Sequence, residues 1–294
     1  IISQSARLEF DAETGQPKFA NECLAIVNEH LSTDGPDLIV DASGRKRLFS
    51  NMMKIPSRSG TRSDAVLFAH LDSADTTVPG HIHIGRLRHG WNWFIPLPGR
   101  MSVGFVMNHE RLKEYGDSNE ERYDNLLRTE PAVKRYITDP KRLTPVMKYT
   151  NYQWVSNRLA GDDWALVGDA AGFIDPVFSS GLYLGMDGAV RLAEAIEQGG
   201  ASAFKRYESE YFSHIRAWQR IVDYYYSGEL FTLFVTGRDR PANWFTRPFR
   251  SHVHRHMGRI FTGQAVTQSY SLRLLDFMVS HAIKSTEVAA LKIN

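Results

Sequence analysis

The segment that most constrains the fold is a short apolar run that leads through Gly-Asp and small residues toward a helix. Trp164–Val167 is apolar and strand-like, and Gly168–Gly172 follows it directly. Small residues let the backbone approach a ligand closely, and Asp169 at a strand end can accept hydrogen bonds from a ribose or ribitol hydroxyl. The same sequence also suits an ordinary strand-to-helix turn with a capping Asp, and both interpretations stay open.

The residues that follow suggest where an anion could bind. Pro176 stiffens the chain, and Ser179-Ser180-Gly181 stands just before a helical pattern that runs over Gly181–Gln198 and stops at Gly199-Gly200. Backbone N–H groups at such a helix start favour an anion. A serine N-cap of the helix is the structural alternative.

Other patterns predict a β-rich first half and a helical end. The first forty residues suggest a β-meander, and the unalternating run Leu38–Val40 suggests a strand buried on both faces of a parallel sheet. Pro98-Gly99 predicts a hairpin turn. The expected strands are Ala6–Phe10, Glu22–Val27, Leu38–Val40, Val66–Leu71, His81–Leu87, Trp91–Pro96, Met101–Met107, Trp154–Leu159 and Trp164–Val167. Helices are expected within Glu110–Tyr136, over Gly181–Gln198, and from Ala203 onward with an interruption around Gly237–Pro248. This order predicts a mixed α+β or α/β fold.

Composition excludes several classes of protein. The formal net charge of the 294 residues is +2, so no strong field favours nucleic acid or an anionic membrane. The single cysteine, Cys23, excludes an internal disulfide framework and a cysteine-rich zinc site. His252 and His256 share a helix face without a neighbouring carboxylate, so we expect no metal site. We expect a cytoplasmic protein, since the sequence shows neither a leader pattern nor an apolar run of about 20 residues.

Four segments resemble known flavoproteins. Gly168-Asp169-Ala170 with the Pro176 turn resembles the second FAD fingerprint of flavoprotein monooxygenases, and Asp37–Arg45 resembles the strand that closes their FAD domain. Trp91-Asn92-Trp93-Phe94-Ile95-Pro96 is similar to the W-x-W-x-I-P signature of flavin-dependent halogenases. The halogenase pattern F-x-x-P-x-x-S-x-G is matched by Phe173, Pro176, Ser179 and Gly181.

The resemblance implies an activity and a role for each matched residue. Reduced FAD, oxygen and a halide such as chloride would give hypohalous acid, which a lysine directs onto an electron-rich ring. The tunnel signature, implied to lie between flavin and substrate and to hinder ordinary monooxygenation, is Trp91, Trp93, Ile95 and Pro96. The implied cofactor residues are Asp41, Ser43, Gly44, Arg45, Gly168, Asp169, Ala170, Pro176 and Ser179, and the implied halide residues are Ser180 and Gly181. For the two tryptophans, strand packing is the alternative.

The resemblance also implies a domain order. Residues 1–60 would end the first segment of a GR2-type FAD-binding domain, and 61–155 would form an antiparallel β-sheet substrate domain. Residues 156–200 would be the second FAD segment, and 201–294 a helical C-terminal region.

The sequence departs from the family at two places. The first fingerprint, G-x-G-x-x-G, and the family's lysine are absent, and Lys18 and Lys46 stand in the wrong places. We therefore expect the C-terminal part of a longer enzyme, with this chain alone inactive and binding FAD poorly. Phe178 replaces the Glu of tryptophan halogenases. This favours a phenol-like or pyrrole-like substrate, free or tethered to a carrier protein, over free tryptophan.

A separate flavin reductase would supply the reduced flavin. Two alternatives remain: a flavin monooxygenase or reductase without halogenation, and a non-catalytic, shortened relative.

Overall fold

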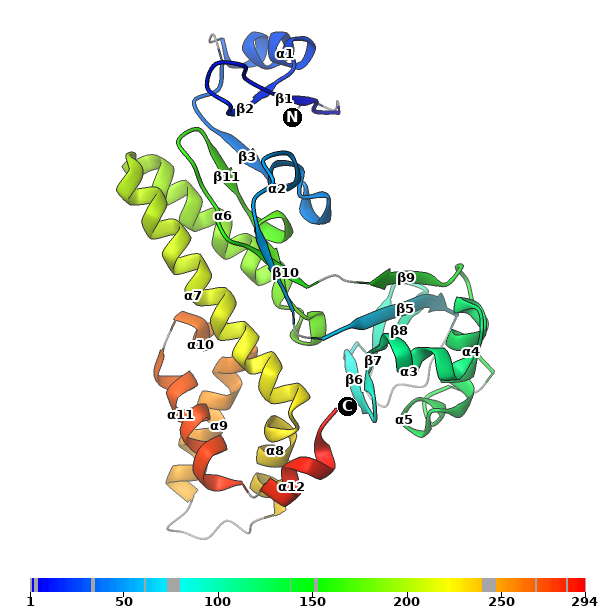
Figure 1. Ribbon diagram of the computed structural model, residues 1–294. Coiled ribbons are helices and arrows are strands. Elements are labelled where there is room, and N and C mark those ends of the chain that lie inside the picture. Colours follow the sequence, from blue (N-terminus) through cyan, green and yellow to red (C-terminus); the bar gives the residue numbers. More distant parts are fainter. Residues whose placement is uncertain are drawn as a thin grey trace. The chain divides into compact units, whose positions relative to one another are not determined.

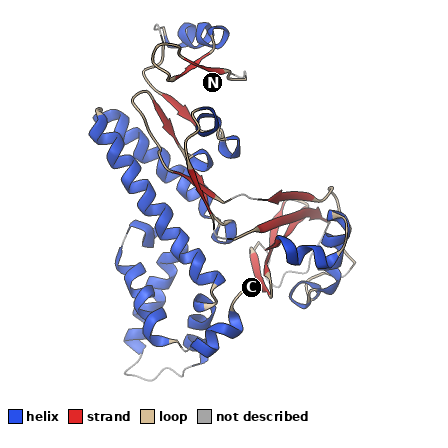
Figure 2. Ribbon diagram, viewed as in Figure 1, coloured by secondary structure: helices blue, strands red, loops and turns tan. Residues whose placement is uncertain are grey.

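The computed structural model describes residues 2, 5–32, 35–60, 62–72, 80–137, 139–150, 153–239, 247–267, 269–283 and 285–293 (Figure 1). The chain divides into two compact units, Ile1–Ser59 with Gln153–Trp218 and Gly60–Tyr152 with Gln219–Asn294. Helices and strands occur in both units, which confirms the mixed fold class (Figure 2). The four-segment domain division stays a prediction. No helix in the described part of the chain is long and apolar enough to cross a membrane.

The first unit combines short strands with two long helices. Its strands are β1 (Leu8–Phe10), β2 (Pro17–Phe19), β3 (Ile39–Asp41), β4 (Ser57–Ser59), β10 (Trp154–Ser156), β11 (Trp164–Leu166) and β12 (Gly172–Phe173). Its helices are α1 (Asn21–Leu31), α2 (Leu48–Met52), α6 (Ser180–Gln198) and most of α7 (Ala201–Tyr226), with the 3-10 turns η1 (Gly44–Lys46), η3 (Gly168–Ala170) and η4 (Pro176–Phe178). β3 and β11 pair in parallel, β12-β10-β4 form an antiparallel sheet, and β1 pairs with β2.

The predicted strand at Glu22–Val27 is wrong, because these residues lie in helix α1. Apolar residues recur there every four positions, at Cys23, Val27 and Leu31. That spacing places them on one helix face, whereas a half-buried strand needs alternation. The first forty residues are therefore a short hairpin followed by a helix, rather than a β-meander.

Strand β3 confirms the predicted parallel pairing but not the predicted burial on both faces. Ile39, Val40 and Asp41 lie opposite Trp164, Ala165 and Leu166. Val40 remains 40% exposed, because among the described strands β3 pairs only with β11. β11 itself is buried at all three positions. β10 ends at Ser156, three residues before the predicted end.

Helix α6 ends as predicted, with Gly199 at φ 67° and its N–H bonded to the carbonyl of Ala195. Its buried face carries small residues such as Gly188, where an added Cβ would lie 2.8 Å from the Tyr211 ring of α7. Small side chains here let α7 lie close against α6. The larger residues Leu182 and Met186 lie on the exposed side.

The second unit is built on a five-stranded antiparallel sheet. Its strands are β5 (Asp64–Leu71), β6 (His83–Leu87), β7 (Gly90–Leu97), β8 (Arg100–Asn108) and β9 (Met147–Thr150), in the order β6-β7-β8-β5-β9. The predicted hairpin joins β7 to β8, with Gly99 in the left-handed region at φ 70°. Because successive side chains of a strand point in opposite directions, each strand places alternate residues on the two faces of this sheet.

One face of this sheet forms a hydrophobic core with the helices that follow β8. Phe94 and Phe105 of the sheet are fully buried together with Tyr123 and Leu126 of the helical segment. The Tyr123 hydroxyl also donates to the carbonyl of Val103 at 3.0 Å. The helical elements are α3 (His109–Leu112), η2 (Lys113–Tyr115), α4 (Asn119–Thr129) and α5 (Pro131–Lys134).

The C-terminal region is helical, as predicted. It contains the end of α7 followed by α8 (Glu229–Asp239), α9 (Arg247–Phe261), α10 (Gln264–Thr267), α11 (Ser269–Ala282) and α12 (Ser285–Leu291). The predicted interruption at Gly237–Pro248 falls mostly outside the described residues.

Candidate functional site

The Gly-Asp-Ala turn, Gly168–Ala170, leaves the end of β11 and packs against α6. Gly168 adopts φ 62°, a conformation that costs other L-residues about 1–2 kcal/mol. A Cβ added at Gly168 would lie 3.9 Å from the Cα of Gly185 in α6. Two glycines therefore bring the turn and the helix backbone together.

The carboxylate of Asp169 lies beside the first turn of α6. A Cβ added at Gly181 would stand 3.9 Å from Asp169 Oδ1. Burial raises the pKa of the Asp169 carboxyl, and the nearby Arg45 guanidinium opposes this by lowering the same pKa. The turn thus places a partly desolvated acid next to the N-terminus of a long helix.

Trp154 joins the two predicted cofactor segments. Its indole N–H donates to the carbonyl oxygen of Asp169 at 3.2 Å. The Arg45 guanidinium lies 6.0 Å from the centre of the Trp154 ring, and that of Arg47 lies 5.3 Å away. The structure therefore brings Arg45 and Asp169 together through a tryptophan that no sequence pattern had identified.

Asp41, Ser43 and Gly44 form the other side of this region. Asp41 is buried, and its carboxylate accepts the N–H groups of Ser43 and Phe49, both at 2.8 Å. Ser43 Oγ accepts the N–H of Leu48 at 3.1 Å, and Gly44 adopts φ 64°. The Asp41 side chain thus organises the turn between β3 and α2.

The start of α6 differs from a serine-capped helix. Ser179 occupies the N-cap position at φ 53°, but its side chain makes no capping hydrogen bond. A serine therefore stands at the N-cap position, as predicted, but its side chain does not cap the helix, because its left-handed backbone replaces the extended conformation that such caps use. Asp175 instead fixes η4, whose first residue is Pro176, by accepting the N–H of Val177 at 3.0 Å. Ser180 Oγ is buried and has no hydrogen-bond partner within the described structure.

The tunnel signature lies in β7 of the second unit. By alternation Trp91, Trp93 and Ile95 share one sheet face, and Pro96 belongs to the other. Trp91 is buried, whereas Trp93 and Ile95 are half-buried. The ring centres of the two tryptophans are 5.6 Å apart.

Each signature tryptophan has its own hydrogen-bond acceptor. Trp91 Nε1 donates to the Tyr226 hydroxyl at 2.9 Å, and Trp93 Nε1 donates to Ser102 Oγ at 3.1 Å. The Trp93 ring lies over Gly104, where an added Cβ would overlap the ring. Gly104 within a strand is a sequence signal of this close approach, whereas no spacing rule links Tyr226 to Trp91.

The predicted cofactor and halide residues belong to the first unit, and the tunnel signature belongs to the second. Within the first unit, the structure brings together the Asp41–Arg45 segment, the Gly-Asp-Ala turn and the start of α6. The signature residues are held separately by partners of their own unit.

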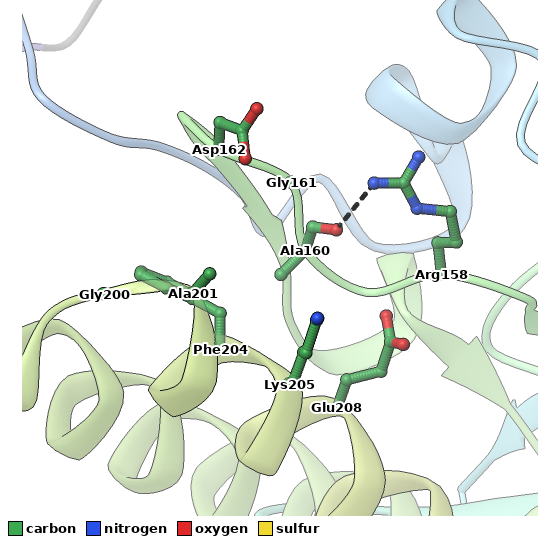
Figure 3. Close-up of a pocket in the computed structure, with 9 residues that line it drawn as sticks. All are labelled: Arg158, Ala160, Gly161, Asp162, Gly200, Ala201, Phe204, Lys205 and Glu208. Atoms are coloured by element: carbon green, nitrogen blue, oxygen red, sulfur yellow. Dashed lines mark hydrogen bonds between the residues drawn. The ribbon is translucent and has the colours of Figure 1, made fainter.

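A pocket of about 340 Å³ lies at the start of α7 in the first unit (Figure 3). Lys205 and Glu208 project from α7 toward the 158–162 segment. Glu208 accepts the N–H of Leu159 at 2.6 Å, and the Arg158 guanidinium donates to the carbonyl of Ala160 at 3.3 Å. None of the predicted site residues lines this pocket.

Among the described residues, no group of three or more His, Cys, Asp or Glu side chains could hold a metal ion. The His256 imidazole is instead bonded to Ser271 Oγ at 2.8 Å.

Comparisons with known proteins identify relatives over most of the chain. A tryptophan 2-halogenase from Chondromyces crocatus is 33% identical over 75% of this chain and 44% of its own length. A 1H-pyrrole-2-carbonyl-[peptidyl-carrier protein] chlorinase from Pseudomonas fluorescens is 26% identical over 79% of this chain and 57% of its own length. A flavoprotein/dehydrogenase structure from Cytophaga hutchinsonii has a TM-score of 0.70 and 23% identity, over 83% of this chain and 60% of that one.

The chain thus spans about half the length of the curated relatives that it matches. The family model described as tryptophan halogenase matches residues 25–229, which include the Gly-Asp-Ala turn, the start of α6 and the tunnel signature. The chain therefore belongs to the tryptophan halogenase family.

Proposed function

We propose that the whole protein containing this chain halogenates an electron-rich aromatic ring, using reduced FAD, oxygen and a halide. The observation that carries the proposal is the start of α6. There the buried Ser180 hydroxyl has no partner among the described residues, and the next residue, Gly181, faces the Asp169 carboxylate. Buried polar groups are normally satisfied, so this arrangement favours a ligand at the site.

The residues of the first unit fit one part of an FAD site. Gly168 and Gly185 let the turn approach α6 closely, and Asp169 in that turn can accept hydrogen bonds from ribitol-type hydroxyls. Asp41, Ser43, Gly44, Arg45, Ala170, Pro176 and Ser179 would complete this part of the site. Bound reduced FAD would supply the electrons that activate oxygen. Because the sequence lacks G-x-G-x-x-G, we expect the 294-residue chain alone to bind FAD poorly and to be inactive.

Halide binding is assigned to the backbone N–H groups of Ser180 and Gly181. The first N–H groups of a helix have no partner within the helix, and the helix dipole favours an anion there. Ser179 does not block these groups with a capping side chain. The Ser180 hydroxyl would add a third donor.

The tunnel signature would guide the oxidised halide toward the ring. Trp91, Trp93 and Ile95 share one sheet face and make that face apolar and rigid, which excludes water from a reactive species. The chain contains no counterpart of the family's directing lysine.

The substrate is assigned as a phenol-like or pyrrole-like ring, free or bound to a carrier protein. Phe178, which stacks near Trp218 at 6.4 Å, occupies the position of the glutamate of tryptophan halogenases. The similarity to a carrier-protein chlorinase supports the same class. A separate flavin reductase would deliver the reduced FAD, and a cytoplasmic location stays part of the proposal.

The test is a mass-spectrometric assay of the complete protein with FAD, NADH, a flavin reductase and either bromide or no halide. Pyrrole-2-carboxyl carrier protein, a simple phenol and free tryptophan serve as substrates. We expect brominated pyrrole or phenol products that depend on bromide. Hydroxylated products without halide would favour a monooxygenase, and absence of any product would favour a non-catalytic relative. Selective bromination of free tryptophan would overturn the substrate assignment.

A further inference from the structure

Tyr226 contacts the tunnel signature from a distant part of the sequence. It is the last residue of α7, and its hydroxyl oxygen accepts the indole N–H of Trp91 at 2.9 Å. The two side chains are 5% and 3% exposed, so water does not compete for the hydrogen bond. A buried hydrogen bond of this kind fixes the rotation of the indole ring.

The Tyr226 ring is itself held in place. The Arg62 guanidinium lies 3.9 Å from the ring centre, a close cation–π contact. Asp64 fixes that guanidinium through two hydrogen bonds of 2.7 and 3.0 Å. The Tyr226 carbonyl also accepts the N–H of Ile293, a buried residue. The Tyr226 hydroxyl, which accepts the hydrogen bond from Trp91, is therefore held in a fixed position.

Trp93 depends on different contacts. Its N–H bonds to Ser102, and its ring rests over Gly104, both on the neighbouring strand β8. Trp91 and Trp93 then meet with ring centres 5.6 Å apart. Rotation of the Trp91 ring would consequently remove its contact with the Trp93 ring, which helps to hold Trp93 in place.

We propose that Tyr226 is a positioning residue for halogenation, acting through Trp91. The inference rests on the proposed function and extends it to the C-terminal helical region. Without the Tyr226 hydroxyl, the Trp91 ring samples other orientations and the signature guides the oxidised halide less well. Small displacements near a reacting group lower productive turnover more than binding.

The test compares Tyr226→Phe with Tyr224→Phe, both made in the complete protein. Tyr226→Phe keeps the ring beneath Arg62 and removes the hydroxyl that accepts the hydrogen bond from Trp91. Tyr224→Phe is the matched control, because it removes a neighbouring hydroxyl of α7 that donates to the Asp276 carboxylate at 2.8 Å. Both variants lose a hydroxyl group, and of the two hydroxyls that of Tyr226 bonds to the signature residue Trp91.

The first readout is the indole N–H resonance of Trp91 in protein labelled with ¹⁵N-tryptophan, assigned with Trp91→Phe. We expect Tyr226→Phe to move this resonance upfield and Tyr224→Phe to leave it in place. The second readout is the yield of halogenated product per oxygen consumed, with kcat and KM measured separately.

We expect Tyr226→Phe to lower this yield and kcat about fivefold, the effect of one lost hydrogen bond, with KM unchanged. An unmoved Trp91 resonance, or equal yields from the two variants, would overturn the inference. If the unaltered protein makes no halogenated product, the proposed function fails, while the resonance still tests whether Tyr226 holds Trp91.

Discussion

In strand β7, Trp91 and Trp93 donate their indole N–H groups to hydroxyl oxygens of the same unit, at 2.9 and 3.1 Å. At the start of α6 the situation is reversed. Ser180 is buried, its hydroxyl has no partner among the described residues, and the side chain of the N-cap residue Ser179 makes no capping hydrogen bond. Backbone conformation fixes this second region, whereas side-chain contacts fix the first.

The difference indicates two kinds of functional surface. The tunnel signature is complete without a ligand, so it should hold its shape whether or not the flavin is bound. The start of α6 leaves the buried Ser180 hydroxyl without a partner among the described residues, as expected where a ligand completes the hydrogen bonding. A substitution in one of these two regions should therefore leave the structure of the other region unchanged.

The largest expected effect is that of Gly104→Ala. The new Cβ would overlap the Trp93 ring, and overpacking of this severity costs about 3 kcal/mol. The measurement is the midpoint of chemical unfolding. Gly258→Ala is the control, since a Cβ at that position in α9 meets nothing within 4 Å. Equal midpoints for the two variants would show that the Trp93 contact is not tight.

A smaller effect is expected from Gly168→Ala. A Cβ at this position would make only an ordinary van der Waals contact, 3.9 Å from the Cα of Gly185, so the cost is that of the left-handed backbone, about 1–2 kcal/mol. Gly185→Ala places a methyl group on the other side of the same close approach without a positive φ, and should leave stability nearly unchanged. Equal unfolding midpoints for these variants would contradict the assignment of backbone strain to Gly168.

The buried serines Ser102 and Ser180 should respond differently to replacement by alanine. Ser102→Ala leaves the Trp93 N–H unpaired and should destabilise the protein by about 1 kcal/mol. Ser180→Ala removes a hydroxyl without a partner, so the free protein should be equally stable or slightly more stable. Thermal unfolding in the absence of ligand checks both. A loss of stability in Ser180→Ala would mean that this hydroxyl already has a partner.

The smallest expected effect concerns Asp169. Burial raises its pKa above the ordinary 3.8, so the folded state keeps a proton that the unfolded chain has released. The free energy of unfolding therefore falls as pH rises from 3.8 toward the raised pKa, and this contribution is constant above it. Asp169→Asn should remove this part of the pH dependence. The urea midpoints of the unaltered protein and of Asp169→Asn are measured across that pH range. If both midpoints change with pH in the same way, the raised pKa of Asp169 is contradicted.

Local patterns predicted much of the fold. The alternation of apolar and polar residues predicted β7 and β8, and Pro98-Gly99 predicted the turn between them. The Gly199-Gly200 pair gave the end of α6. The sequence pattern does not predict helix α1, because its start, at Ala20, lacks a capping side chain and its short apolar run also suits a strand. A run of this length does not by itself separate the two structures.

The candidate site was less predictable, because its supports come from distant residues. Trp91 and Tyr226 are 135 positions apart, and no spacing rule links them. Trp154 reaches Asp169 only because β10 pairs with β12. The roles of the predicted cofactor, halide and signature residues stay proposals.

The most direct measurement is hydrogen exchange of the complete protein, with and without reduced FAD and bromide, under anaerobic conditions. The account predicts slower exchange of the amides within residues 168–181 when both ligands are present, and unchanged exchange in β7. Unchanged exchange at 168–181 in a preparation that halogenates would contradict the assignment of the flavin and halide to the Gly-Asp-Ala turn and the start of α6.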